Sequence, residues 1–232
     1  MCLIAIAHLA STRWPLVIAA NRDEFLDRPA RAAHAWDDAP DVVGGRDLRA
    51  GGSWLAVTRG GRFAMVTNVR GLPEPHDAPS RGALVADFVK GHAAPLVYAE
   101  GVERARYAGF HLVVGEAGRI AAHVSSDAAA RVIEPGIFAV SNAPAAIDWP
   151  KIAYAREAME RALQSDDIEP ELMRFLTTPR GGPIESEVFV ALPAMNYGTR
   201  ASTIVIAAAD GAIDFTERTA AGEARFRLRS PS

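Results

Sequence analysis

Two short apolar runs, residues 2–9 and 15–21, open the chain and restrict what it can fold into. Both are rich in Ile, Leu, Val and Ala, as buried strands are, and a turn at 11–14 separates them. Neither run is long enough to span a membrane, and no basic segment precedes the first, so a signal peptide is not indicated. We therefore expect a buried antiparallel hairpin at the start of the chain and no transmembrane segment.

Beyond this hairpin, groups of strands alternate with two groups of helices. Residues 24–53 are polar, with Pro and Gly and little periodicity, and are expected to form a long functional loop. A helix is expected to start at Asp148, with Pro in its first turn. The expected strands are 54–58, 62–68, 110–114, 120–124, 137–140, 202–208, 212–219 and 225–228, and the expected helices are 81–90, 96–106, 148–163 and 168–176.

Grouped hairpins and grouped helices favour an α+β fold, with helices packed on antiparallel sheets, over a βαβ alternation. The chain has no repeat, linker or shift in composition, so we expect residues 1–232 to form a single domain. Oligomerisation stays open.

Composition excludes several classes of partner and compartment. The net charge is only -3, from 25 basic and 28 acidic side chains, so no nucleic-acid or acidic-membrane partner is expected. The chain has a single cysteine, so no intramolecular disulfide forms and a cytoplasmic location is expected. The six histidines lack metal-site spacing, and neither a P-loop nor a nucleophile elbow is present, so we expect no metal and no cofactor.

Cys2 is the first candidate for chemistry. The initiator Met1 is expected to be removed because the next side chain is small, which leaves Cys2 with a thiol and a free α-amine. Such an amine has a pKa of roughly 7.7–8, so part of it is unprotonated at neutral pH and can serve as the base for the thiol. The alternative is that Cys2 is a small buried apolar residue at the start of a strand.

Polar residues 21–24 directly follow the second apolar run and cannot all be buried without partners. In an antiparallel hairpin, residues 21–23 lie beside Cys2. There the Asp23 carboxylate can hold the α-amine, and the Arg22 guanidinium can lower the thiol pKa. The alternative is a solvated strand end with an Arg–Asp pair on the surface.

Asn68, Asn142 and Arg200 form a third group of candidates. Both asparagines follow strand-like runs, where a side-chain amide can donate to a developing oxyanion, although Asn is also a common turn residue. Arg200 begins a predicted strand and is either a carboxylate anchor or an exposed charge.

Nine motifs, spread over nearly the whole chain and taken in order, resemble one family, the NRDE-motif family, also called the transport and Golgi organisation 2 family. They are Cys2-Leu3-Ile4, Asn21-Arg22-Asp23-Glu24-Phe25, Gly51-Gly52-Ser53-Trp54-Leu55, Thr67-Asn68, Arg81-Gly82, Gly109-Phe110-His111-Leu112, Ser141-Asn142-Ala143, Tyr197-Gly198-Thr199-Arg200 and Phe215-Thr216-Glu217-Arg218. That family resembles the N-terminal-nucleophile hydrolases, which implies a four-layer α-β-β-α sandwich of antiparallel sheets.

The cysteine branch of those hydrolases includes choloylglycine and penicillin V amidases and acid-ceramidase-like enzymes. The resemblance implies that Cys2 is the nucleophile, that Asp23 contacts it, and that Asn142 supplies the oxyanion amide. Asn68 falls where a second polar donor is expected, and Arg200 where a strand-start arginine is expected. One departure is that Ala20 stands where such amidases often have Arg, while Arg22 lies inside the motif. Asn21 and Trp54, within the shared motifs, are expected to contact substrate.

Three functions compete. The first is a cysteine amidohydrolase that cleaves a linear amide or acyl bond of a small molecule. The second is a non-catalytic carrier of haem or an acyl lipid, with Cys2 or His8 as a possible axial ligand; eukaryotic members of the family are associated with secretory organisation, lipid metabolism and haem mobilisation. The third is a scaffold that acts through surface contacts. The joint presence of Cys2, Asp23 and Asn142 favours the first, because a carrier needs only a pocket.

Overall fold

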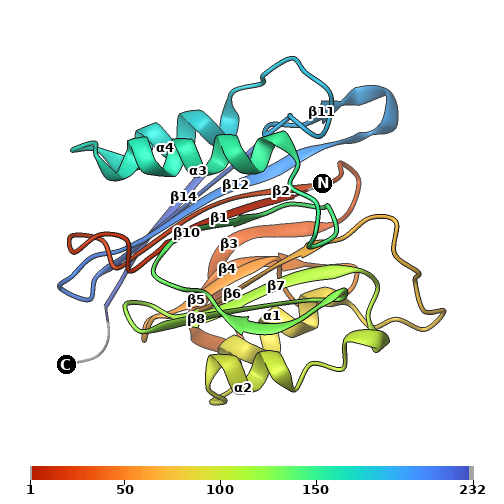
Figure 1. The fold of residues 1–232 in the computed structure, drawn as a ribbon, viewed down its shortest axis with the longest axis horizontal. Helices are drawn as coiled ribbons and strands as arrows, with labels where there is room; N and C mark the ends of the chain where they lie inside the picture. Colours follow the sequence, from red (N-terminus) through yellow and green to blue (C-terminus); the bar gives the residue numbers. More distant parts are fainter. Residues whose placement is uncertain (1, 230–232) are drawn as a thin grey trace.

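The computed structural model describes residues 2–229, which form four layers (Figure 1). Two antiparallel sheets lie face to face in the middle, and a pair of helices covers the outer face of each sheet. The expected α+β class and the four-layer arrangement are therefore confirmed. Within residues 2–229, the helices are all too short or too polar to cross a membrane.

Sheet A has the strand order β10-β1-β2-β12-β13-β14, and β11 pairs with β12. Its strands are β1 (Leu3–His8), β2 (Leu16–Phe25), β10 (Gly136–Val140), β11 (Ala191–Leu192), β12 (Tyr197–Ala207), β13 (Ile213–Thr219) and β14 (Gly222–Leu228). Its outer face carries α3 (Pro150–Leu163) and α4 (Ile168–Thr177).

Sheet B runs from β3 to β9 in sequence order. Its strands are β3 (Ala30–Trp36), β4 (Ala39–Asp47), β5 (Leu55–Thr58), β6 (Arg62–Asn68), β7 (Phe110–Glu116), β8 (Ile120–Ser125) and β9 (Ala128–Val132). Its outer face carries α1 (Arg81–Lys90) and α2 (Pro95–Glu100).

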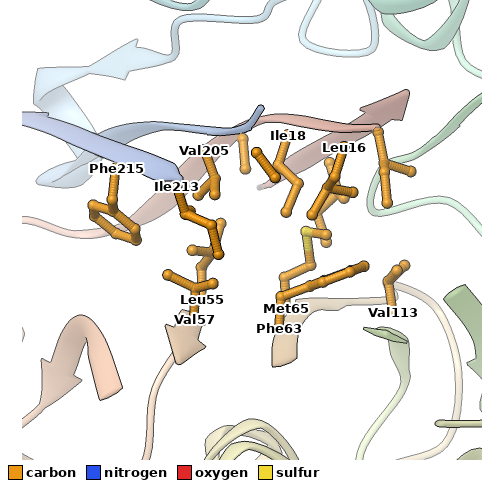
Figure 2. Close-up of a cluster of buried hydrophobic side chains, with 14 of the residues drawn as sticks. Leu16, Ile18, Leu55, Val57, Phe63, Met65, Val113, Val205, Ile213 and Phe215 are labelled. Atoms are coloured by element: carbon orange, nitrogen blue, oxygen red, sulfur yellow. The ribbon is translucent and has the colours of Figure 1, made fainter. Parts of the chain in front are cut away.

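Alternation along the strands explains why the opening hairpin is apolar on both faces. In β1, Ile4 and Ile6 point into the core between the sheets, whereas Leu3 and Ala5 point toward α3 and α4. Figure 2 shows the inter-sheet cluster, in which side chains of sheet A meet those of sheet B. Burial on both faces removes the polar alternation that a half-exposed strand shows.

The prediction that residues 24–53 form a loop was wrong, because β3 and β4 occupy most of this segment. The glycines that suggested a loop are packing positions instead. A Cβ on Gly44 would lie 2.4 Å from the Leu55 carbonyl oxygen, and one on Gly45 would lie 2.0 Å from the Trp54 ring. Glycine is therefore needed in β4 to let the neighbouring strand and the indole approach.

Smaller differences occur at the ends of elements. The helix expected over residues 96–106 ends at Glu100 and is followed by a short 3-10 turn, Arg104–Arg106. Asp148 does not cap α3, because the N-cap position is Trp149, and the Asp148 carboxylate accepts from Arg156 instead. β9 was not predicted, and β12 begins at Tyr197, earlier than expected.

Candidate active site

The candidate site lies where three neighbouring strands of sheet A present their ends. Leu3 pairs with Asn21, so Cys2, just before β1, lies beside Arg22 of β2. β10 lies on the other side of β1 and ends at Val140, which brings Asn142 to the same edge. Because these strands are antiparallel, the start of one lies beside the ends of its neighbours.

Cys2 lines a cleft with a volume of about 680 Å³ that opens at this edge. Its backbone nitrogen donates to Asn142 Oδ1 at 2.5 Å. Its Sγ lies 4.0 Å from the backbone oxygen of Asp23. Cys2 therefore lines the cleft, while its nitrogen is bound to the buried Asn142. The expected removal of Met1 concerns a residue outside the described range.

Asn142 is fully buried, and the contacts of its amide differ from the expected oxyanion role. Its Oδ1 accepts from Cys2, and its Nδ2 donates to Thr67 Oγ1 at 3.1 Å and to the Asn68 backbone oxygen at 3.0 Å, as well as to Asn68 Oδ1. An amide has only two hydrogens to donate, and both are engaged. The structure therefore places Asn142 as the holder of the Cys2 nitrogen and of Asn68, away from the cleft lining.

Asn68, at the end of β6, lines the cleft. Its Oδ1 accepts from Asn142, which directs its Nδ2 away from Asn142. Within residues 2–229 that Nδ2 has no acceptor, and it is not a buried unsatisfied atom. Asn68 is therefore the amide that can donate to an oxyanion in the cleft.

Asp23 lies on the face of β2 that looks toward α3, and its carboxyl group is buried. Burial raises the pKa of this carboxyl, while the hydrogen bond that Thr199 donates to Oδ1 at 2.6 Å and the charge of Lys151 lower it. Lys151 is itself buried and donates to the backbone oxygens of Ile184 and Glu187 at 3.5 and 3.3 Å. The site thus includes a buried cation behind the carboxylate.

Arg22 points to the inner face of sheet A, beside the thiol. Its guanidinium lies over the Trp54 ring at 4.4 Å and within 3.4 Å of Asp47 and 3.9 Å of Glu24. Burial lowers the Arg22 pKa, and the nearby Cys2, Glu24 and Asp47 raise it. The guanidinium therefore places a positive charge beside the Cys2 sulfur.

Besides Asn142, two predicted site residues lie outside the lining of this cleft. The side chain of Asn21 faces the helices, where its Nδ2 donates to the backbone oxygens of Leu176 and Val188, each at 2.8 Å. No local sequence signal indicates which face of the strand Asn21 occupies. Arg200 occupies a bulge of β12 and donates to the backbone oxygens of Phe25 and Arg28, so it ties the turn after β2 to sheet A. These contacts engage both side chains away from the cleft, and the expected substrate contact of Asn21 and anchor role of Arg200 stay predictions.

Sequence reasoning missed the roles of three residues near the cleft. Lys151 interacts with the charge of Asp23, and the Tyr197 hydroxyl donates to the Asp23 backbone oxygen at 3.0 Å. Arg81 lines the cleft at the start of α1. A lysine in the first turn of an amphipathic helix is normally exposed, so no sequence signal marks Lys151 as buried. Arg81 and Tyr197 each stand within a family motif, which was the available signal.

The family profile described as Transport and Golgi organisation 2 matches residues 1–222. The chain belongs to this family. The Transport and Golgi organization protein 2 homolog of Bos taurus is 31% identical, over 96% of this chain and 94% of that protein. The Homo sapiens homolog is 30% identical, over 94% of this chain and 93% of that protein.

Solved structures of hydrolases share the fold at low sequence identity. Penicillin V acylase from Agrobacterium tumefaciens has a TM-score of 0.57 and 14% identity, over 99% of this chain and 86% of the acylase. A mutant of the conjugated bile acid hydrolase from Clostridium perfringens has a TM-score of 0.55 and 8% identity, over 99% of this chain and 92% of the hydrolase. These likenesses confirm the N-terminal-nucleophile hydrolase fold.

Proposed function

We propose that this chain is a cysteine amidohydrolase of the N-terminal-nucleophile type, which cleaves a linear amide or related acyl bond of a small molecule. The observation that carries the proposal is the placement of Cys2. Its nitrogen is held at 2.5 Å by Asn142, and its thiol lines a cleft beside Arg22. Nucleophile and base then belong to one residue once the α-amine is free. As part of this proposal the whole chain acts as a single domain in the cytoplasm, where thiols stay reduced.

Acylation follows from this geometry. The thiol proton passes to the α-amine, and Sγ forms a bond to the acyl carbon, so that the carbonyl oxygen becomes an oxyanion. Asn68 Nδ2 donates to that oxyanion. When the intermediate collapses, the carbon–nitrogen bond breaks, and the ammonium group of Cys2 returns the proton to the departing amine. A thioester on Cys2 remains.

Deacylation uses the same groups in reverse order. Water attacks the thioester carbon and gives a proton to the α-amine, and the oxyanion forms again at Asn68. Collapse breaks the carbon–sulfur bond, releases the carboxylic acid and leaves a thiolate, which recovers the proton from the ammonium group. The nearby Arg22 stabilises that thiolate.

Substitution of Cys2 tests the proposal. We expect intact mass to show a mature chain that starts at Cys2, and short-lived acyl adducts on Cys2 during turnover of acyl amides. Cys2→Ser and Cys2→Ala should lower hydrolysis by orders of magnitude and leave the unfolding temperature almost unchanged, because the site is partly open to solvent. Retention of Met1, or a large loss of stability in Cys2→Ser with hydrolysis unaltered, would contradict the proposal.

An apolar rim supports a second candidate, non-catalytic carriage of an acyl lipid or haem. Of the seven large apolar side chains that are exposed within residues 2–229, two line the cleft, Phe25 (51% exposed) and Met195 (61%). Two more, Leu26 (48%) and Leu48 (61%), are chain neighbours of residues that line it.

For haem, the axial ligand would be Cys2, because His8 is buried at the opposite end of β1 and does not line the cleft. The carrier hypothesis expects Cys2→Ser to keep acyl-lipid binding and to lose a haem thiolate band. No spectral shift on adding haem to the wild-type protein would dismiss the axial-ligand form of this hypothesis.

A further inference from the structure

The cleft contains more positive charge than its own carboxylates neutralise. The arginines that line it are Arg22, Arg28, Arg49, Arg70 and Arg81. Arg22 and Arg28 share the carboxylates of Asp47 and Glu24. Within residues 2–229, the other three arginines form no ion pair. Two more carboxylates line the cleft: Asp23, which interacts with the charge of Lys151, and the exposed Glu74, which lies beyond ion-pair distance of these three arginines.

Arg81 is an unpaired arginine that lies beside the proposed chemistry. Its Nη1 donates to the Gly109 backbone oxygen at 2.9 Å, and the Val69 nitrogen donates to the same oxygen at 2.8 Å. The guanidinium therefore lies beside the end of β6, next to Asn68. Burial lowers the Arg81 pKa, and the nearby Cys2 acts in the opposite direction.

Close backbone contacts hold the start of α1, which places Arg81 against the cleft. Gly82 packs so closely on Gly52 that a Cβ on Gly52 would lie 2.4 Å from the Gly82 carbonyl group. Gly82 accepts from the Ser53 nitrogen at 3.1 Å, and the Ser80 side chain caps the helix by accepting from the Gly82 nitrogen. Arg81 is thus oriented before any ligand arrives, which lowers the entropy cost of binding.

We propose that the ligand of this cleft carries an anionic group, a carboxylate or a phosphate, close to its acyl bond, and that Arg81 binds that group. Arg70, which also lines the cleft, supplies a second cation, and its backbone nitrogen donates to the Asn142 backbone oxygen at 3.0 Å at the same edge. A partly buried guanidinium with unused donors and no counter-ion is suited to a bidentate anion. The proposal rests on the proposed function only in calling the ligand a substrate.

Alkylation of Cys2 by two reagents of nearly equal size tests this without any turnover. Iodoacetate is an anion and iodoacetamide is neutral. We expect Arg81→Gln to lower the ratio of their alkylation rates, iodoacetate over iodoacetamide, by roughly tenfold. Arg81→Lys should have an intermediate effect. Arg119→Gln, at an exposed arginine that does not line the cleft, should leave the ratio unchanged.

A second measurement uses the wild-type protein, so that it stands even if Arg81→Gln does not fold. At constant ionic strength, inorganic phosphate or acetate should slow alkylation of Cys2 by iodoacetamide. Protection by phosphate alone identifies a phosphate ligand, and protection by acetate alone identifies a carboxylate. Two results would overturn the proposal: a folded Arg81→Gln variant with an unchanged ratio of alkylation rates, or a wild-type protein that neither phosphate nor acetate protects. Because neither assay requires hydrolysis, an anion effect without amidase activity would reject the enzyme and keep the site.

Discussion

The side-chain amides of Asn142 and Asn68 are hydrogen-bonded to each other beside Cys2, and they have different roles. Asn142 holds the Cys2 nitrogen through its oxygen and fixes Asn68 through its amide hydrogens. Asn68 is left with a donor that faces the cleft. Both residues were expected from the sequence to be amide donors to an oxyanion. Truncation of Asn68 removes such a donor, whereas truncation of Asn142 removes the acceptor of the Cys2 nitrogen and the support of Asn68.

We predict that Asn68→Ala lowers the hydrolysis rate by about 10²- to 10³-fold, the usual effect of removing one oxyanion donor. Alkylation of Cys2 by iodoacetamide should be unchanged in this variant, because that reaction forms no oxyanion. Asn142→Ala should lower both rates, since the nitrogen of Cys2 loses its acceptor and Asn68 its support. If the two variants lose hydrolysis and keep alkylation equally, the division of roles is wrong.

At the scale of elements, β7 and β8 support the segment that carries Asn142. His111 Nε2 lies 2.7 Å from the Ala143 backbone oxygen, so this nitrogen carries a hydrogen. His111 Nδ1, at 3.0 Å, then accepts from His123 Nε2. Both rings are buried and stacked. A proton added to His111 Nδ1 would face the hydrogen of His123 Nε2, and one added to His123 would charge a buried ring, so both rings stay neutral.

This histidine pair predicts loss of stability in mild acid. Burial lowers the pKa of His123 to about 3, with the neighbouring His111 adding to the effect, and burial also lowers the pKa of His111. The unfolded chain takes up these protons near its ordinary pKa of about 6.5, whereas the folded chain resists them. Stability is therefore complete above about pH 6.5 and falls as the pH decreases, by about 1 kcal/mol per pH unit and histidine. Urea unfolding at pH 7.5 and pH 5 measures this loss of stability. His123→Gln, which keeps a donor for His111, should show a smaller difference in unfolding free energy between the two pH values. A difference equal to that of the wild type would reject the assignment.

The glycines of β4 show where sequence reasoning works and where it stops. The opening hairpin and the strand pair 54–58 and 62–68 were predictable because their signals are local: apolar runs in both, and the pair Gly60-Gly61 between the two later strands. Gly44 and Gly45 signalled a loop, yet they are required by a tertiary contact with the neighbouring strand and Trp54. The same limit applies to Lys151, whose burial depends on the loop that folds over it, and to Asn21, whose face depends on the strand register.

A matched pair of glycine substitutions measures that contact. Gly45→Ala should destabilise the protein by about 1–3 kcal/mol, because the added methyl group meets the Trp54 ring. Gly60→Ala, in the following hairpin turn, meets only Thr58 Oγ1 at 3.8 Å and should change stability by less than about 0.5 kcal/mol. Midpoints of urea unfolding give both values. Equal midpoints for the two variants would show that the segment around Trp54 adapts freely.

At the scale of the whole molecule, a buried carboxylate joins the two sheets. Glu217 of β13, in sheet A, accepts from the Ala33 backbone nitrogen of β3, in sheet B, at 2.6 Å, and from Thr203 Oγ1 at 3.3 Å. Burial raises the pKa of this carboxyl, while its hydrogen bonds and the charge of Arg22 lower it. Glu217 therefore connects the inter-sheet core to the group that lies beside Cys2.

We predict that the acceptor oxygen of Glu217 matters more for stability than its charge. Glu217→Ala leaves the buried Ala33 nitrogen without an acceptor and opens a cavity, so it should destabilise the protein by about 1–3 kcal/mol. Glu217→Gln keeps an oxygen for Ala33 and removes the cost of burying a charge, so its stability at pH 7.5 should be close to that of the wild type. Loss of the Glu217 charge should instead affect Arg22, because its guanidinium loses a nearby carboxylate in both variants. Urea unfolding measures the first effect. The rate of Cys2 alkylation at pH 7.5 measures the second, and it should change alike in the two variants. If Glu217→Gln is as unstable as Glu217→Ala, then the charge, and not the hydrogen bond to β3, holds the sheets together at this point.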